Sequence, residues 1–157
     1  MKNFIAIAIV TVFLTSCATK SSFHSFYEEN KMESDFSISS PAFIANIFIP
    51  KEDIKEYEDL FSKVRHYKVM IFSDSSTSLN KKFNSFIKSR NYTSILRINQ
   101  SGDKIQFYLL KKGDIIKEMI LKVKSDNDFV LLGLKTNISE YDFNTIVENS
   151  NINVASN

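Results

Sequence analysis

The chain is poor in the residues on which several classes of protein depend. Its 157 residues include one Cys, three Gly, two Pro, two His and no Trp. A single Cys cannot form a disulfide within the chain or a Cys-cluster metal site, and three glycines are too few for a glycine-rich phosphate loop. No Gly-x-Ser-x-Gly elbow and no His-Glu-x-x-His motif is present. We therefore predict that the protein is not an enzyme, holds no metal and needs no cofactor.

The chain also has no large excess of charge of either sign. Lys and Arg number 20 against 18 Asp and Glu, and the only adjacent basic pairs are Lys81-Lys82 and Lys111-Lys112. Proteins that bind nucleic acid usually gather their basic residues on one face, so we do not expect a nucleic-acid partner. The 43% hydrophobic content with a net charge of +2 excludes disorder over most of the chain. The length suits one domain.

The strongest signal lies in the first seventeen residues. Lys2 is followed by an uncharged run from Phe4 to Leu14, which is too short for a membrane span but suits the apolar region of a signal peptide. The run ends in Leu14-Thr15-Ser16-Cys17, which resembles the lipobox of bacterial lipoproteins. We expect cleavage between Ser16 and Cys17 and acylation of the Cys17 thiol. The alternatives are an ordinary signal peptide with a chance Cys, or a buried apolar helix.

Acylation would make the lipid bilayer the first partner of the chain. Two or three acyl chains anchor a protein stably, whereas one does not. No Asp follows Cys17, and by resemblance to the sorting rules of enteric bacteria we expect an outer-membrane anchor that faces the periplasm. The expected organisation is a signal peptide (1–16), a lipidated Cys with a tether (17–22), one domain (23–150) and a polar tail (151–157).

Several stretches carry apolar residues at the spacing of amphipathic helices. We expect helices over residues 23–31, 53–64, 79–91 and 139–149. Ser139 and Asp142 fit the Ser-x-x-acid cap of the last one. Ser40 and Pro41 have the chemistry of an N-cap and a first helical residue, although the apolar residues that follow, Phe43–Phe48, also fit a strand.

Strand patterns dominate the second half of the chain. These patterns predict strands at 35–39, 93–99, 104–111, 115–124 and 129–135, and a β-branched and aromatic run predicts a buried strand at 67–72. The last four are joined by loops too short for parallel crossovers, so they should pair antiparallel in sequence order. We expect an α+β fold of two layers, in which a mainly antiparallel sheet also takes in strand 67–72. The helices should cover one face, against residues such as Phe107 and Leu121.

Apolar and glycine positions recur in a definite pattern along these four strands. The pattern comprises Tyr92-x-x-Ile95-x-x-Ile98, Gly102, Ile105-x-Phe107, Gly113-x-Ile115-x-Lys117-Glu118-x-Ile120-x-x-Val123 and Phe129-Val130-Leu131-Leu132. It resembles the domain of unknown function 4252, a family of lipoproteins from Gram-negative bacteria. Thr136-Asn137 stands where family members often carry Gly, and Asn tolerates the same turn. The family has no established activity, so the resemblance implies architecture and location only.

Glu118 is the candidate binding residue, because it lies in the middle of an otherwise apolar strand. It is either a solvent-facing residue paired with a Lys of a neighbouring strand or part of a binding site. We expect a membrane-anchored envelope lipoprotein that acts as a non-enzymatic binding or structural module, with an envelope protein on its exposed sheet face. The alternative is a small-ligand carrier or enzyme with a pocket between sheet and helices near Glu118.

Overall fold

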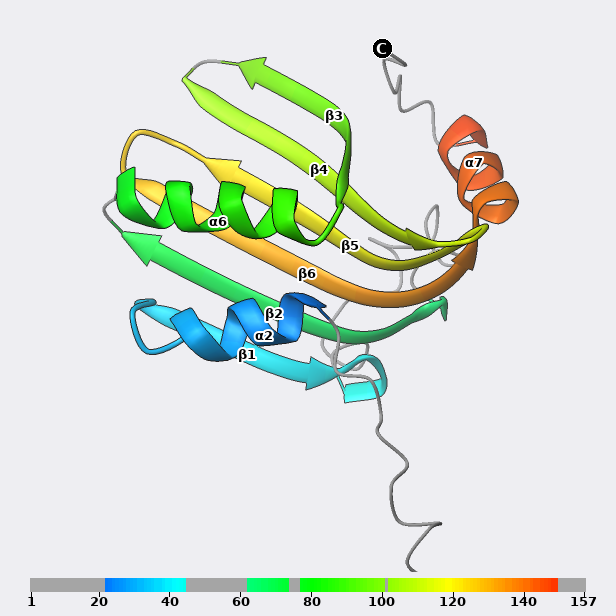
Figure 1. Cartoon of the computed structure of the whole chain (residues 1–157), viewed down its shortest axis with the longest axis horizontal. Helices are drawn as coiled ribbons and strands as arrows, with labels where there is room; N and C mark the ends of the chain where they lie inside the picture. The colour runs from blue at the N-terminus through cyan, green and yellow to red at the C-terminus, as the bar shows by residue number, and fades with distance from the viewer. Residues whose placement is uncertain (1–21, 45–61, 74–76, 101, 150–157) are drawn as a thin grey trace, which may run out of the picture.

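The computed structural model describes residues 22–44, 62–73, 77–100 and 102–149 (Figure 1). These residues form three helices and six strands within the described ranges. In chain order they are α2 (Ser22–Asn30), β1 (Phe36–Pro41), β2 (Val64–Ser73), α6 (Thr77–Ser89), β3 (Thr93–Gln100), β4 (Asp103–Lys112), β5 (Ile115–Lys124), β6 (Asp128–Ser139) and α7 (Glu140–Asn149). None of the described helices is both long enough and apolar enough to cross a membrane.

All six strands belong to one antiparallel sheet in the order β1-β2-β6-β5-β4-β3. The prediction of an α+β fold with a four-strand antiparallel meander is confirmed, and β2 joins the sheet beside β6 as expected. Gly102 (φ 94°) and Gly113 (φ 60°) have the left-handed backbone that the tight turns before β4 and β5 require. The short turns therefore fix the pairing of β3 to β6.

Helices α2 and α6 cover one face of the sheet, which we call the front face (Figure 1). The centre of this layer is a cluster of aromatic rings in which Phe83 of α6 contacts Phe26 of α2, Tyr108 of β4 and Phe129 of β6, with ring centroids 5.6–6.1 Å apart. Phe83 and Phe129 have no exposed surface. Fully burying one such ring contributes about 1.5–3 kcal/mol, so this cluster holds both helices on the sheet.

Helix α7 packs on the opposite face, the back face. Its Phe143 belongs to a cluster with Leu109 and Met119, which alternate along their strands with the front-face residues Tyr108 and Ile120. The expectation that all helices share one face is therefore wrong for α7, and α6 packs against Tyr108 rather than Phe107. The sequence carries the reason: consecutive apolar residues on a strand indicate burial on both faces, and Met119 and Ile120 are both fully buried.

The structure also differs from the predicted secondary structure at two other places. Ser40 and Pro41 do not begin a helix. They end edge strand β1, opposite Tyr67 and His66, and helical backbone starts only at Ala42. Pro is tolerated there because the end of an edge strand does not need its missing N–H. The predicted helix over 53–64 lies largely outside the described residues, and its last residue, Val64, begins β2.

Candidate functional site: a basic groove beside helix α6

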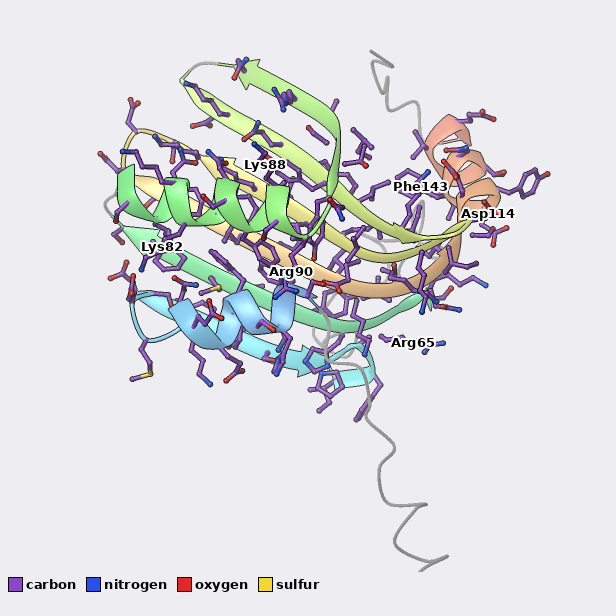
Figure 2. The ribbon with its side chains drawn as sticks, viewed as in Figure 1. Arg65, Lys82, Lys88, Arg90, Asp114 and Phe143 are labelled. Atoms are coloured by element: carbon purple, nitrogen blue, oxygen red, sulfur yellow. The ribbon has the colours of Figure 1, made fainter. Side chains whose placement is uncertain are left out.

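A groove of about 570 Å³ runs along the front face between α6 and strands β3, β4 and β5. Helix α6 contributes Asn80, Asn84 and Lys88 to one wall, and the strands contribute the floor and the other wall. Figure 2 shows Lys88 on the side of α6 that faces the strands, whereas Lys82 lies on the side that faces α2. The groove is thus open along the flank of α6 that α2 does not cover.

The groove is lined by cations. Five basic residues line it, and no Asp or Glu is found among its described lining residues; the five are Lys88, Arg97, Lys104, Lys122 and Lys124. Strand register explains how they meet. Lys104 and Lys124 are direct cross-strand partners, while Arg97, Gln106 and Lys122 form the adjacent row across three strands.

The Lys104–Lys124 pair costs stability. Like charges directly opposite each other in a sheet repel, and within the described part of the chain neither lysine has an ion-pair partner. A sheet gains nothing from this arrangement unless an anion neutralises it. The arrangement suits a negatively charged ligand, which would relieve the repulsion between the two lysines.

Lys122 lies deepest in the groove. It is 4% exposed, its Nζ donates to Asn80 Oδ1 at 2.7 Å and to Asn84 Oδ1 at 3.5 Å, and it lies over the Phe83 and Phe129 rings at 5.4 and 5.5 Å. Burial, and to a smaller extent the positive charges of Lys124, Arg97 and Lys104, lower the pKa of Lys122 to about 8. A bound anion would compensate both effects, because it supplies the opposite charge that this ammonium group lacks.

Lys68 offers an instructive contrast on the same face. It is also buried, it donates to Ser39 Oγ at 2.6 Å, and its Nζ lies 4.4 Å from the centre of the Tyr27 ring. Burial lowers its pKa too; the nearby Glu28 raises it, and the charge of Lys31 lowers it to a smaller extent. Lys68 has a carboxylate of its own chain within electrostatic range, whereas Lys122 is surrounded by cations. Because of this difference, the groove is a better candidate for an anion site than the surroundings of Lys68.

Glu118 is buried rather than solvent-facing, and among the described residues it forms no ion pair with a Lys, although Lys135 is its cross-strand partner, so that interpretation of the sequence is wrong. It is 5% exposed. Its Oε1 accepts the Ser22 amide at 2.6 Å, and its Oε2 accepts the Phe23 amide at 2.9 Å and the Tyr92 hydroxyl at 2.7 Å. The first amides of a helix have no partner within the helix, and a carboxylate there is also favoured by the helix dipole. Glu118 is therefore an N-terminal cap for α2, supplied from strand β5.

The Glu118 cap and the groove share one residue. Tyr92 lines the groove and also donates its hydroxyl to Glu118. Burial raises the pKa of Tyr92, and the Glu118 charge raises it further, so the phenol stays protonated and keeps donating. Glu118 thus fixes one end wall of the groove without lining it.

The other predicted site residues, Ser16 and Cys17, lie outside the described residues. Within the described ranges there is no group of three or more His, Cys, Asp or Glu side chains that could hold a metal ion. Sequence reasoning missed Lys122 and its neighbours because alternation shows which residues share a face but not which face a helix covers. The cross-strand pairing of Lys104 with Lys124 depends on a β-bulge at Leu110/Lys111 that shifts the register after the turn at Gly113, so the turn alone does not predict it.

Comparison with curated proteins and with solved structures finds no match for this chain. A family model does match it: that of the domain of unknown function DUF4252, over residues 27–146. The matched region begins within α2 and extends into α7, so it covers every described strand. The chain belongs to the DUF4252 family.

Proposed function

We propose that this protein is a lipid-anchored, non-enzymatic binding module of the cell envelope, and that the basic groove beside α6 takes an anionic ligand. The observation that carries the proposal is the groove lining of five cations without a carboxylate. Phosphate and carboxylate groups are the anions that Lys and Arg recognise through charge-assisted hydrogen bonds. The volume of about 570 Å³ suits a small organic anion better than a single inorganic ion.

The groove chemistry favours binding over turnover. Its lining residues include no His, Cys, Asp or Glu. Lys122 and Tyr92, which belong to residue types that can transfer protons, already donate to Asn80 and Glu118. The amides of Asn80, Asn84 and Gln106 add neutral hydrogen-bond donors beside the cations. Donors and positive charge that converge on one space hold an anion in a fixed orientation.

The proposed anchor rests on Leu14-Thr15-Ser16-Cys17 and on the apolar run before it. Acylated Cys17 would hold the domain at the outer membrane, facing the periplasm. Mass spectrometry of the protein purified from membranes tests this: we expect a mature chain that begins at an acylated Cys17, and a Cys17→Ser variant that stays unprocessed. An unmodified Cys17 in the membrane fraction would contradict the anchor.

The groove is tested by anion-dependent thermal stability of the full-length protein in non-ionic detergent. The probes are pyrophosphate and citrate, compared with chloride at equal ionic strength. A ligand that binds only the folded state raises the melting temperature, and the rise grows with the ratio of ligand concentration to dissociation constant. The groove variant is Lys104→Gln/Lys124→Gln. The matched control is Lys81→Gln/Lys112→Gln, which removes two exposed lysines that do not line the groove.

We expect pyrophosphate or citrate to raise the melting temperature of the wild type and of the control variant, and to have little effect on the groove variant. Equal shifts in all three proteins would mean that the anions act on overall charge, and the groove would be rejected as a binding site.

A further inference from the structure

The start of α2 fixes where a tether would leave the domain. The Ser22 amide bonds to Glu118, and Glu118 lies in a row across the sheet with Lys135, His66 and Pro41, which are successive cross-strand partners. The chain therefore enters the fold at the end of the sheet where β1 ends and β2 begins. We call this the tether end.

The reach from the anchor is short. Cys17 precedes Ser22 by five residues, which span at most about 17 Å when fully extended. If Cys17 is acylated, Ser22 lies within that distance of the bilayer surface, and the surface beside Ser22 lies close to lipid headgroups. The opposite end of the sheet cannot take this position, since α2 and the strands separate it from Ser22.

The tether end carries exposed apolar and basic side chains, which suit contact with a bilayer surface. Phe43 and Ile44, which follow β1, are 72% and 40% exposed. Lys63, Arg65 and Lys135 are exposed at the same end of the sheet, and Figure 2 shows Arg65 beyond the start of β2. Residues 42–44, 62–66 and 134–137 contain no Asp or Glu. Exposed apolar side chains next to cations are typical of surfaces that lie on anionic membranes.

From this geometry we infer that the patch formed by Phe43, Ile44, Lys63, Arg65 and Lys135 lies against the anionic phospholipid surface of the membrane that holds Cys17. The inference rests on the anchor of the proposed function. Phe43 and Ile44 enter the headgroup region, and the three cations contact lipid phosphates. The domain is then held in one orientation rather than turning freely on its tether.

This orientation decides from which side a ligand reaches the groove. Lys104 and Lys124 lie six residues along β5 from Glu118, which is about 20 Å away from the tether end. The most basic part of the groove therefore points away from the anchoring bilayer. Its ligand comes from the aqueous phase or from a partner beyond it, not from the headgroups around the anchor.

The inference is tested with site-specific fluorescence on the full-length acylated protein in vesicles of phosphatidylethanolamine and phosphatidylglycerol. Cys17 is the only native Cys, and acylation blocks its thiol, so a single introduced Cys takes the label. Phe43→Cys reports on the tether end. Met32→Cys is the matched control, because Met32 is 88% exposed and lies two residues beyond the C-terminal end of α2, away from Ser22. Lipids that carry a nitroxide near the headgroup quench a label that lies at the membrane surface.

We expect several-fold stronger quenching of the label at position 43 than of the label at position 32. A Lys63→Gln/Arg65→Gln variant should reduce the quenching at position 43 and leave circular dichroism unchanged. Equal or reversed quenching in protein that is acylated and membrane-bound would overturn the orientation while the anchor stands. Protein that carries no acyl chain and stays out of the vesicles would instead overturn the anchor, and this inference with it.

Discussion

The Tyr92 hydroxyl and the Glu118 carboxylate are joined by a 2.7 Å hydrogen bond that connects three elements of the fold. Tyr92 precedes β3, Glu118 lies on β5, and the same carboxylate accepts the first two amides of α2. Bonds to a buried charge are shorter and stronger than neutral ones. This cap therefore couples the end of the groove to the element that carries the tether.

Loss of the cap should destabilise the protein strongly. Glu118→Gln keeps the shape of the side chain but replaces one acceptor by a donor, which leaves buried donors unpaired. We expect the free energy of unfolding to fall by about 3 kcal/mol, measured by urea denaturation. Tyr92→Phe should cost about 1 kcal/mol. The double variant should cost less than the sum of the two, because they remove one shared bond; strict additivity would show that the two residues do not interact.

Gly133 is required by the close approach of α2 to the sheet. A Cβ at this position would lie 2.0 Å from Phe23 Cδ1, so Gly133→Ala must displace Phe23 and the start of α2. We expect a loss of about 2–3 kcal/mol in the free energy of unfolding. The control is Gly113→Ala, where the added Cβ meets nothing within 4 Å. There only the left-handed backbone costs stability, about 1 kcal/mol; a larger loss at Gly113 than at Gly133 would contradict this account.

Sequence reasoning predicted the strand order correctly where the chain itself imposes it. Loops as short as the one around Gly113 leave antiparallel pairing as the only possibility, and alternation on β4 and β5 sets the register. The same reasoning failed to predict which face of the sheet each helix covers, because both faces carry apolar residues. Alternation separates Tyr108 from Leu109, but both are apolar, so nothing local decides which of them α6 covers.

Glu118 shows the same limit of sequence reasoning for the candidate functional site. An acidic residue in an apolar strand is normally placed toward water, because burying a charge without partners is expensive. The partners here are two backbone amides of a helix 95 or more residues away in sequence, together with Tyr92. No pattern within the strand reveals them. The groove cations were equally hidden, since scattered lysines gather only after the sheet and α6 are assembled.

The repulsion between Lys104 and Lys124 predicts that neutralising one of the two lysines stabilises the fold. Lys104→Gln should raise the free energy of unfolding by about 0.2–1 kcal/mol in the absence of anions. Lys112→Gln, a change on the same strand outside the groove, should leave it nearly unchanged. The comparison is made by urea denaturation at low ionic strength. Equal changes in the free energy of unfolding for the two variants would show that Lys104 and Lys124 do not repel each other measurably.

Lys122 makes stability depend on pH in a defined window. Its pKa is about 8 in the folded protein and 10.5 ordinarily. Below pH 8 both states hold the proton, and between pH 8 and 10.5 the unfolded chain binds the additional proton, so the free energy of unfolding rises with pH across this window. The rise attributable to Lys122 is up to ~3 kcal/mol. It is measured as the difference in the free energy of unfolding between the wild type and Lys122→Met at each pH. The contributions of the tyrosines and other lysines are common to both proteins and cancel in this difference.

The same titration should govern anion binding. An anion in the groove favours the charged form of Lys122, so binding is strongest where that ammonium group is already protonated. We expect the affinity for pyrophosphate to fall as the pH rises through about 8, the pKa of Lys122. Lys122→Met should bind more weakly at pH 7, because it lacks the ammonium group, and should lose the part of the pH dependence that comes from its titration. Calorimetric titration at pH 7 and pH 9 measures both effects, and an affinity for the wild type that does not change between these pH values would exclude Lys122 from the binding site.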